Sequence, residues 1–208
     1  MAAKGLLGAF VFGLILLLSM PAGAQDTVSA SRFEIFGGFS HMNFKPGSSI
    51  TGLPGQHFNG ADGSIAWNPL PQLGLVADFG GFHTGSFAGA GSASAASFLV
   101  GPQLTLRSRR VDPFVHALFG VLRIGGSADA NFPQSGFAMA WGGGLDVKAK
   151  SHLAIRVIQL DYVFSRMAIS GLQPTIAGPE TPTDQHSFRL AVGVVFRLGP
   201  QLSTLPAF

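Results

Sequence analysis

Eight long runs in which apolar side chains alternate with small or polar ones follow one another along the chain. A two-residue period is typical of a β-strand whose two faces meet different surroundings. The runs are residues 33–44, 57–68, 72–83, 96–107, 113–124, 136–148, 152–165 and 187–198. Each exceeds the roughly five or six residues of a typical soluble strand and is long enough for a tilted strand to cross a bilayer. The sequence therefore predicts an all-β protein.

The connections between these runs alternate in length. Residues 69–71, 108–112 and 149–151 form three short connections, while residues 45–56, 84–95, 125–135 and 166–186 form four long ones. A barrel inserted from one side of a membrane has short periplasmic turns at one rim and long extracellular loops at the other. The pattern predicts an eight-stranded antiparallel up-and-down transmembrane β-barrel. We expect it to be one domain over residues 25–208, with strands over about 33–198 and a short tail at 199–208.

The first 24 residues have the pattern of a secretory signal peptide. Lys4 precedes an apolar run over residues 6–20, and Ala22, Gly23 and Ala24 supply the small residues that a signal peptidase reads. An uncleaved membrane anchor is the alternative, although the run is shorter than the ~20 residues of a spanning helix. We therefore expect an exported chain.

Composition narrows the function classes. Charged residues make up 11% of the chain, against about 25% in soluble proteins. The net charge is +3 and the only basic cluster is Arg107, Arg109 and Arg110, so we expect no nucleic-acid partner. The absence of cysteine excludes disulfides, thiolate zinc sites and cysteine nucleophiles.

The two faces of each run differ in polarity. In the last run Phe188, Leu190, Val192, Val194, Phe196 and Leu198 share one face, opposite a mixed face of small and charged residues. We assign the apolar face to lipid, because a charge at mid-bilayer costs ~2–4 kcal/mol. A secreted lipocalin-like barrel that carries an apolar ligand would turn this face inward instead. The small residues of the mixed face favour a tight barrel interior.

Two runs do not show one clear phase. In the fifth run two sets of apolar residues compete, and we predict that His116 faces inward. In the seventh run the alternation shifts, and a β-bulge near Val157 and Ile158 would reconcile its two halves.

Charges of both signs fall on the inward face. They are Glu34, Asp62, Asp78, Arg107, Asp146, Arg156, Asp161, Arg189 and Arg197. Burial without partners is costly, so we expect salt bridges that fill the lumen. The alternative function is a narrow gated pore for small solutes or ions, in which these pairs switch.

Aromatic residues near the ends of the runs fit interfacial girdles. Trp67, Trp141, Tyr162 and Phe164 are the main candidates, together with Phe33, Phe44, Phe114 and Phe196. His57, His83 and His186 fall at the expected outer rim, but no motif around them indicates a catalytic or metal site. We therefore expect no enzyme activity, cofactor or metal.

The opening run FEIFGGFSHMNF, the glycine-flanked run FAMAWGGGLDV and the closing run SFRLAVGVVFRL resemble those of eight-stranded outer-membrane barrels of the OmpA-like type. The resemblance covers nearly all of the exported chain. It implies an assembly signal at Gly193, Phe196 and Leu198, although Ala191 stands where that signal has a polar residue and residues 199–208 follow it.

The same resemblance implies a location in the outer membrane of a Gram-negative bacterium. The expected partners are outer-membrane lipid, lipopolysaccharide and the barrel-assembly machinery. We expect a monomer with a structural or surface-interaction role, whose loops carry any specificity for a host or surface ligand.

Overall fold

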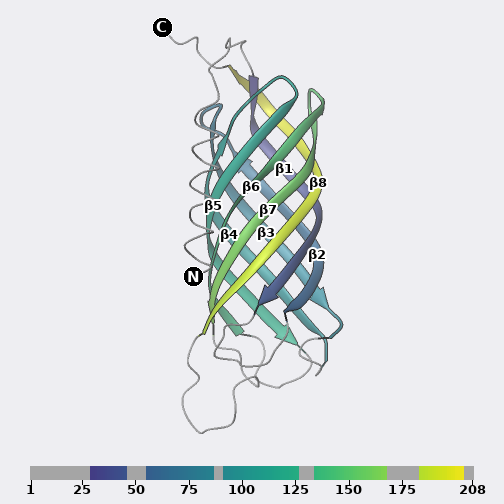
Figure 1. Cartoon of the computed structure of the whole chain (residues 1–208). Helices are drawn as coiled ribbons and strands as arrows, with labels where there is room; N and C mark the ends of the chain where they lie inside the picture. Colours follow the sequence, from purple (N-terminus) through teal and green to yellow (C-terminus); the bar gives the residue numbers. More distant parts are fainter. Residues whose placement is uncertain (1–28, 46–54, 87–90, 127–133, 168–182, 204–208) are drawn as a thin grey trace, which may run out of the picture.

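The chain forms a closed antiparallel barrel (Figure 1). The computed structural model describes residues 29–45, 55–86, 91–126, 134–167 and 183–203. Its strands are β1 (Ser29–Lys45), β2 (Gln56–Trp67), β3 (Leu73–Thr84), β4 (Ala93–Thr105), β5 (Val111–Gly126), β6 (Gln134–Lys150), β7 (Leu153–Met167) and β8 (Thr183–Ser203). Each strand pairs with the next, and β8 pairs with β1 to close the wall. Within the described ranges no helix is long and apolar enough to span a membrane.

Several strands extend beyond the predicted runs. The largest difference is in β8, which continues to Ser203 and pairs with the first residues of β1, for example Leu202 with Ala30. The expected tail at 199–208 is therefore wrong for its first five positions. Backbone pairing continues where the hydrophobic alternation stops, because ladder hydrogen bonds do not need an apolar face. The predicted signal peptide and residues 204–208 lie outside the described residues.

The barrel has two distinct ends. Residues 68–72, 106–110 and 151–152 connect strands at what we call the short-turn end. Backbone bonds brace this end, for example from Asn68 N to Arg32 O over 2.8 Å and from Lys148 N to Arg110 O over 2.8 Å. The four longer connections leave from the opposite, long-connection end, and most of their residues lie outside the described ranges. The predicted eight-stranded up-and-down barrel is thus confirmed.

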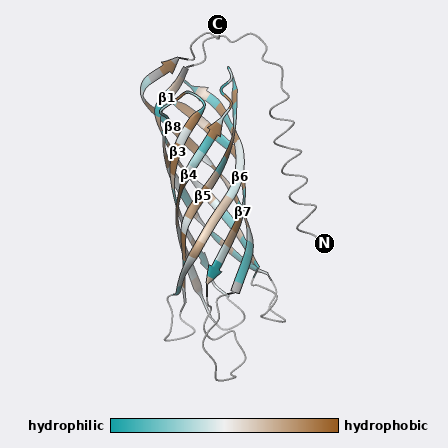
Figure 2. Ribbon diagram, turned by 90° about the vertical axis from the view of Figure 1, so that its left-hand side faces the viewer, coloured by the Kyte–Doolittle hydropathy of each residue, from teal (hydrophilic) through white to brown (hydrophobic). Residues whose placement is uncertain are grey.

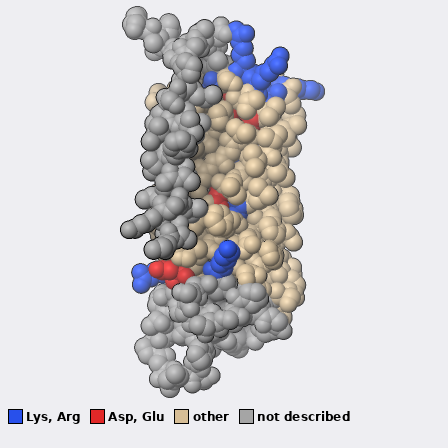
Figure 3. Space-filling view, in the orientation of Figure 1, with Lys and Arg blue, Asp and Glu red and all other residues tan. Residues whose placement is uncertain are grey.

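Each strand carries exposed apolar side chains on its outward face. Phe39, Leu160 and Phe196 are more than half exposed on the barrel wall, and the hydropathy of the strands can be followed in Figure 2. Charged residues gather near the two ends, whereas the visible wall between them is almost free of charge (Figure 3). A lipocalin-like carrier needs the apolar face inside, so that alternative is excluded by the direction of the side chains.

Both ambiguous strands are now assigned. His116 is buried inside the barrel, which confirms its predicted direction. The β7–β8 register shifts between Arg156 and Gln159, and Val157 and Ile158 are both exposed on the outer wall. The predicted bulge is therefore confirmed, and it turns both Arg156 and Gln159 inward.

The interior is not uniformly polar. Sixteen side chains, each no more than 5% exposed, form what we call the inner apolar cluster: Met42, Phe44, Phe58, Ala66, Val76, Phe82, Ala93, Ala95, Leu99, Leu118, Leu122, Ile124, Ala138, Ala140, Val163 and Met167. Most of them lie on the strand halves nearest the long-connection end. Sequence analysis expected a lumen filled by paired charges and did not foresee this apolar half.

The predicted aromatic girdle is only partly compatible with the structure. Phe44 and Phe114 are buried inside the barrel, so their assignment to a girdle was wrong. Trp141 faces outward near the middle of β6 rather than at its end.

The other candidates also face outward. Phe33 and Trp67 lie near the short-turn end, and Phe196 lies closer to that end of β8. Tyr162 and Phe164 are half-buried on the outer wall, in the half of β7 nearest the long-connection end.

Candidate functional site in the barrel interior

Arg189 is the hub of the interior charges. It lies on β8 and is 1% exposed. Its Nη1 donates to Asp78 Oδ1 over 2.7 Å, and its Nε and Nη2 donate to Asp161 Oδ2 over 2.9 and 2.8 Å. Asp62 Oδ2 lies 3.0 Å from Nη1 as a third anionic partner. Because Asp62 and Asp78 come from β2 and β3, this one guanidinium ties β8 to the facing wall.

Asp161 is the most heavily hydrogen-bonded carboxylate of this hub. Besides Arg189, it accepts a hydrogen bond from His116 Nε2 over 2.8 Å and one from Gln159 Nε2 over 2.8 Å. In register, His116 and Asp161 are separated by Gly142 of β6, whose missing side chain leaves room for the contact. We call Asp62, Asp78, His116, Gln159, Asp161 and Arg189 the Arg189 cluster.

Arg156 extends this network toward the short-turn end. Its Nη1 donates to Gln159 Oε1 over 2.7 Å. Its Nε and Nη2 donate to Oδ1 and Oδ2 of Asp146 over 2.8 and 3.1 Å. The guanidinium lies between two aromatic rings, 4.3 Å from the centroid of Phe36 and 4.2 Å from that of Phe114. Stacking and a bidentate ion pair together offset the cost of burying this charge.

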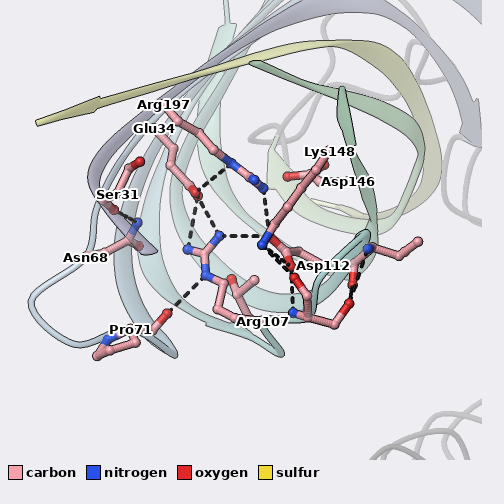
Figure 4. Close-up of polar contacts among 12 residues, drawn as sticks. Ser31, Glu34, Asn68, Pro71, Arg107, Asp112, Asp146, Lys148 and Arg197 are labelled. Atoms are coloured by element: carbon pink, nitrogen blue, oxygen red, sulfur yellow. Dashed lines mark hydrogen bonds and ion pairs between the residues drawn. The ribbon is translucent and has the colours of Figure 1, made fainter. Parts of the chain in front are cut away.

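A second group of charges lies at the short-turn end (Figure 4). Arg107 Nη1 donates to Glu34 Oε1 over 2.7 Å, and its Nε donates to the carbonyl of Pro71 in the β2–β3 turn over 3.0 Å. Arg197 Nη2 donates to Asp112 Oδ2 over 2.8 Å, and Lys148 Nζ lies 3.3 Å from Asp112 Oδ1. We call these five charged residues the short-turn cluster.

Opposite charges in the interior nearly balance. Six carboxylates are buried: Glu34, Asp62, Asp78, Asp112, Asp146 and Asp161. They face Arg107, Lys148, Arg156, Arg189 and Arg197, together with the imidazole of His116. Such pairing brings distant strands together and neutralises charge inside the barrel. Among the described residues no group of three or more His, Asp or Glu side chains could hold a metal ion.

The nine predicted lumen charges all point inward, and the structure distributes them over three groups. Asp62, Asp78, Asp161 and Arg189 meet in the Arg189 cluster, Asp146 meets Arg156, and Glu34, Arg107 and Arg197 meet at the short-turn end.

Asp112, which is fully buried, was not among the predicted lumen charges because it was placed in a turn. The alternation back from His116 through Phe114 to Asp112 was the signal that could have found it.

The predicted assembly signal lies on β8. Phe196 and Leu198 face outward and are about half exposed. Gly193 pairs with Gly38 of β1, and a Cβ on Gly193 would lie 2.3 Å from Gly37 O. The glycine therefore allows a close approach at the closing seam of the barrel. Recognition by an assembly machinery stays a prediction.

Comparison with known proteins identifies the fold type. No protein-family model matches the chain, and no curated protein sequence matches it. Among solved structures, Ail, the attachment invasion locus protein of Yersinia pestis, matches with a TM-score of 0.52 and 14% identity over 81% of this chain and 99% of Ail. Neisserial surface protein A matches with a TM-score of 0.57 and 12% identity over 81% of this chain and 98% of that protein.

A third match is the N-terminal β-barrel domain of Pseudomonas aeruginosa OprF, with a TM-score of 0.50 and 11% identity over 82% of this chain and 99% of the domain. All three are eight-stranded barrels of bacterial outer membranes. At such low sequence identities these matches show the fold and not the function. Together with the closed barrel described above, they show that this chain has the fold of the eight-stranded outer-membrane barrels.

Proposed function

We propose that the protein is an integral outer-membrane barrel with a closed interior and a structural or surface-interaction role, without enzyme activity. The inner apolar cluster is the observation that supports this most directly. Its side chains are at most 5% exposed and fill the part of the barrel nearest the long-connection end. Between them and the short-turn end, the Arg189 cluster and the short-turn cluster join strands on opposite sides of the barrel through ion pairs.

The same packing argues against a gated pore. Rearranging the ion pairs of Arg189 would free a polar path only in the middle of the barrel. A charged solute would still meet Phe58, Leu118 and Leu122, each at most 1% exposed. Moving an unpaired charge through such surroundings is costly.

The outer wall supports the proposed partners. Its belt of exposed apolar side chains suits lipid, and the closed ladder leaves no strand edge for pairing with a second copy, which favours a monomer. We assign contact with lipopolysaccharide to the long-connection end of the barrel. We assign any specificity for a surface ligand to residues 46–54, 87–90, 127–133 and 168–182. The short-turn end then faces the periplasm, as in one-sided insertion.

Conductance in planar bilayers tests the closed interior. We expect the purified wild-type barrel to insert without producing steady current steps, because apolar packing blocks the path of ions. The variant Arg189→Gln breaks the hub but leaves the inner apolar cluster in place, so it should remain silent as well.

Each alternative has its own result in this experiment. Steady steps from the wild type would contradict the closed interior. Steps from the Arg189→Gln variant alone would show that the hub is a gate. Slower migration in gels after boiling identifies folded barrel in both samples and confirms that silence does not come from unfolded protein.

A further inference from the structure

Two histidines meet on the outer wall near the long-connection end. β1 and β2 pair with His41 opposite Asn59 and with Asn43 opposite His57. The four side chains share the outward face, so His41 and His57 are diagonal neighbours on adjacent strands. His57 is exposed and His41 is half-exposed, which leaves both imidazoles accessible from outside.

The contacts of His41 fix which of its nitrogens carries hydrogen. His41 Nδ1 lies 2.8 Å from Asn59 Oδ1, and an amide oxygen can only accept. Nδ1 therefore donates, and the lone pair of neutral His41 is left on Nε2. This nitrogen accepts a hydrogen bond from Nδ1 of His57 over 3.4 Å, which a bound metal ion would replace, and the two rings stack with their centroids 5.5 Å apart.

The spacing of these two nitrogens is that of two ligands on one metal ion. Tetrahedral zinc with Zn–N bonds of about 2.0–2.1 Å holds two of its nitrogen ligands about 3.3–3.4 Å apart. We infer that His41 Nε2 and His57 Nδ1 bind one divalent transition-metal ion, such as Cu²⁺ or Zn²⁺, on the outer wall. Asn59 is a positioning residue in this site, since a bond to the remote ring nitrogen orients a ligating histidine.

The rest of the surroundings defines an open site with two protein ligands. When the metal binds, the hydrogen of His57 must sit on Nε2, because Nδ1 supplies its lone pair to the ion. Water completes the coordination. Asn43 lies directly opposite His57, and its Oδ1 is shielded from solvent and has no hydrogen-bond partner among the described residues. Because water does not reach that oxygen, Asn43 adds neither a ligand nor a partner for bound water, and the two histidines are the protein ligands of the site.

Calorimetric titration of tag-free, chelator-treated protein in detergent micelles with Cu²⁺ and Zn²⁺ tests the site. We expect one equivalent to bind, with Cu²⁺ tighter than Zn²⁺. His41→Gln and His57→Gln should each weaken binding at least tenfold. Asn59→Leu should weaken it about tenfold or more while leaving both ligands in place.

His83 provides the matched control. It lies on the same outer wall one strand further along, but its Nδ1 pairs with Ser94 Oγ over 3.1 Å rather than with another histidine. His83→Gln should bind metal like the wild type. Wild-type affinity in the His41→Gln or His57→Gln variant, equal loss in His83→Gln, or no one-equivalent binding by the wild type would each overturn the proposal. Copper electron paramagnetic resonance adds a readout, with two nitrogen ligands expected and none in the double variant.

Discussion

The missing side chain of Gly142 makes the contact between His116 and Asp161 possible. The three residues lie in one row across β5, β6 and β7. A Cβ on Gly142 would lie 2.0 Å from Asp161 Oδ1 and 2.3 Å from the carbonyl oxygen of Leu160. The second of these atoms belongs to the backbone and cannot turn away. The best-satisfied carboxylate of the barrel thus depends on a residue that makes no polar contact itself.

Gly142→Ala should therefore destabilise the barrel. Overpacking of this kind costs about 1–3 kcal/mol, to be measured as a lower urea midpoint for unfolding from lipid vesicles. Gly81→Ala is the matched control, because a Cβ there would meet nothing within 4 Å. Equal midpoints for the two variants would show that the row across β6 can relax.

At the scale of elements, β8 is held to three other strands by one side chain. Arg189 reaches Asp62 on β2, Asp78 on β3 and Asp161 on β7. These carboxylates are not equivalent. Asp161 accepts hydrogen bonds from three different side chains, whereas neither oxygen of Asp62 has a hydrogen-bond partner among the described residues despite its close approach to Arg189. Asp62 therefore packs against the guanidinium with little directional bonding.

Neutralising these two carboxylates should have different effects. Asp161→Asn breaks a buried ion pair and places an amide among donors, so we expect a loss of about 3–5 kcal/mol in unfolding free energy. Asp62→Asn replaces a carboxyl that has no hydrogen-bond partner among the described residues, and it should change stability by less than about 1 kcal/mol. Chemical denaturation in vesicles measures both. A similar loss for the two variants would show that Asp62 binds Arg189 as firmly as Asp161 does.

The strands also show how far sequence reasoning reaches. Alternation placed all eight strands and gave the direction of charges such as Arg189, because a charge strongly prefers one side of a membrane wall. It could not foresee Phe44 or Phe58 inside the barrel, since an apolar side chain suits either lipid or a packed interior. The fifth strand was ambiguous for this reason, whereas Asp112 was missed because it was assigned to the turn before that strand. The metal-binding proposal for His41 depends on cross-strand register, which no single run contains.

At the scale of the whole molecule, the two ends of the barrel differ in charge. Arg32, Arg110 and Lys150 are exposed at the short-turn end, and cations gather there in Figure 3. The acids of that end, Glu34 and Asp112, are buried in the short-turn cluster. The proposed orientation places this basic rim in the periplasm.

The absence of native cysteine allows that orientation to be measured with single cysteines. Ser48→Cys lies in the first long connection, and Ser151→Cys lies in the exposed β6–β7 turn. A membrane-impermeant maleimide should label position 48 on intact cells and position 151 only after the cells are broken. Labelling of both positions in detergent shows that each thiol is reactive. Labelling of position 151 but not of position 48 on intact cells would show that the barrel has the opposite orientation in the membrane.

The inner apolar cluster also has a consequence for how the wall can come apart. In that half of the barrel, packed hydrocarbon covers the inner face of the sheet, and in the proposed membrane lipid would cover the apolar part of its outer face. Water then reaches the backbone amides only after one of these two layers has moved aside. The inner face of the other half carries most of the buried charges, beside a smaller apolar cluster of Phe36, Ala154, Ala191 and Val195. We therefore expect this sheet to loosen first from the half nearest the short-turn end, and we expect the half nearest the long-connection end to unfold more slowly.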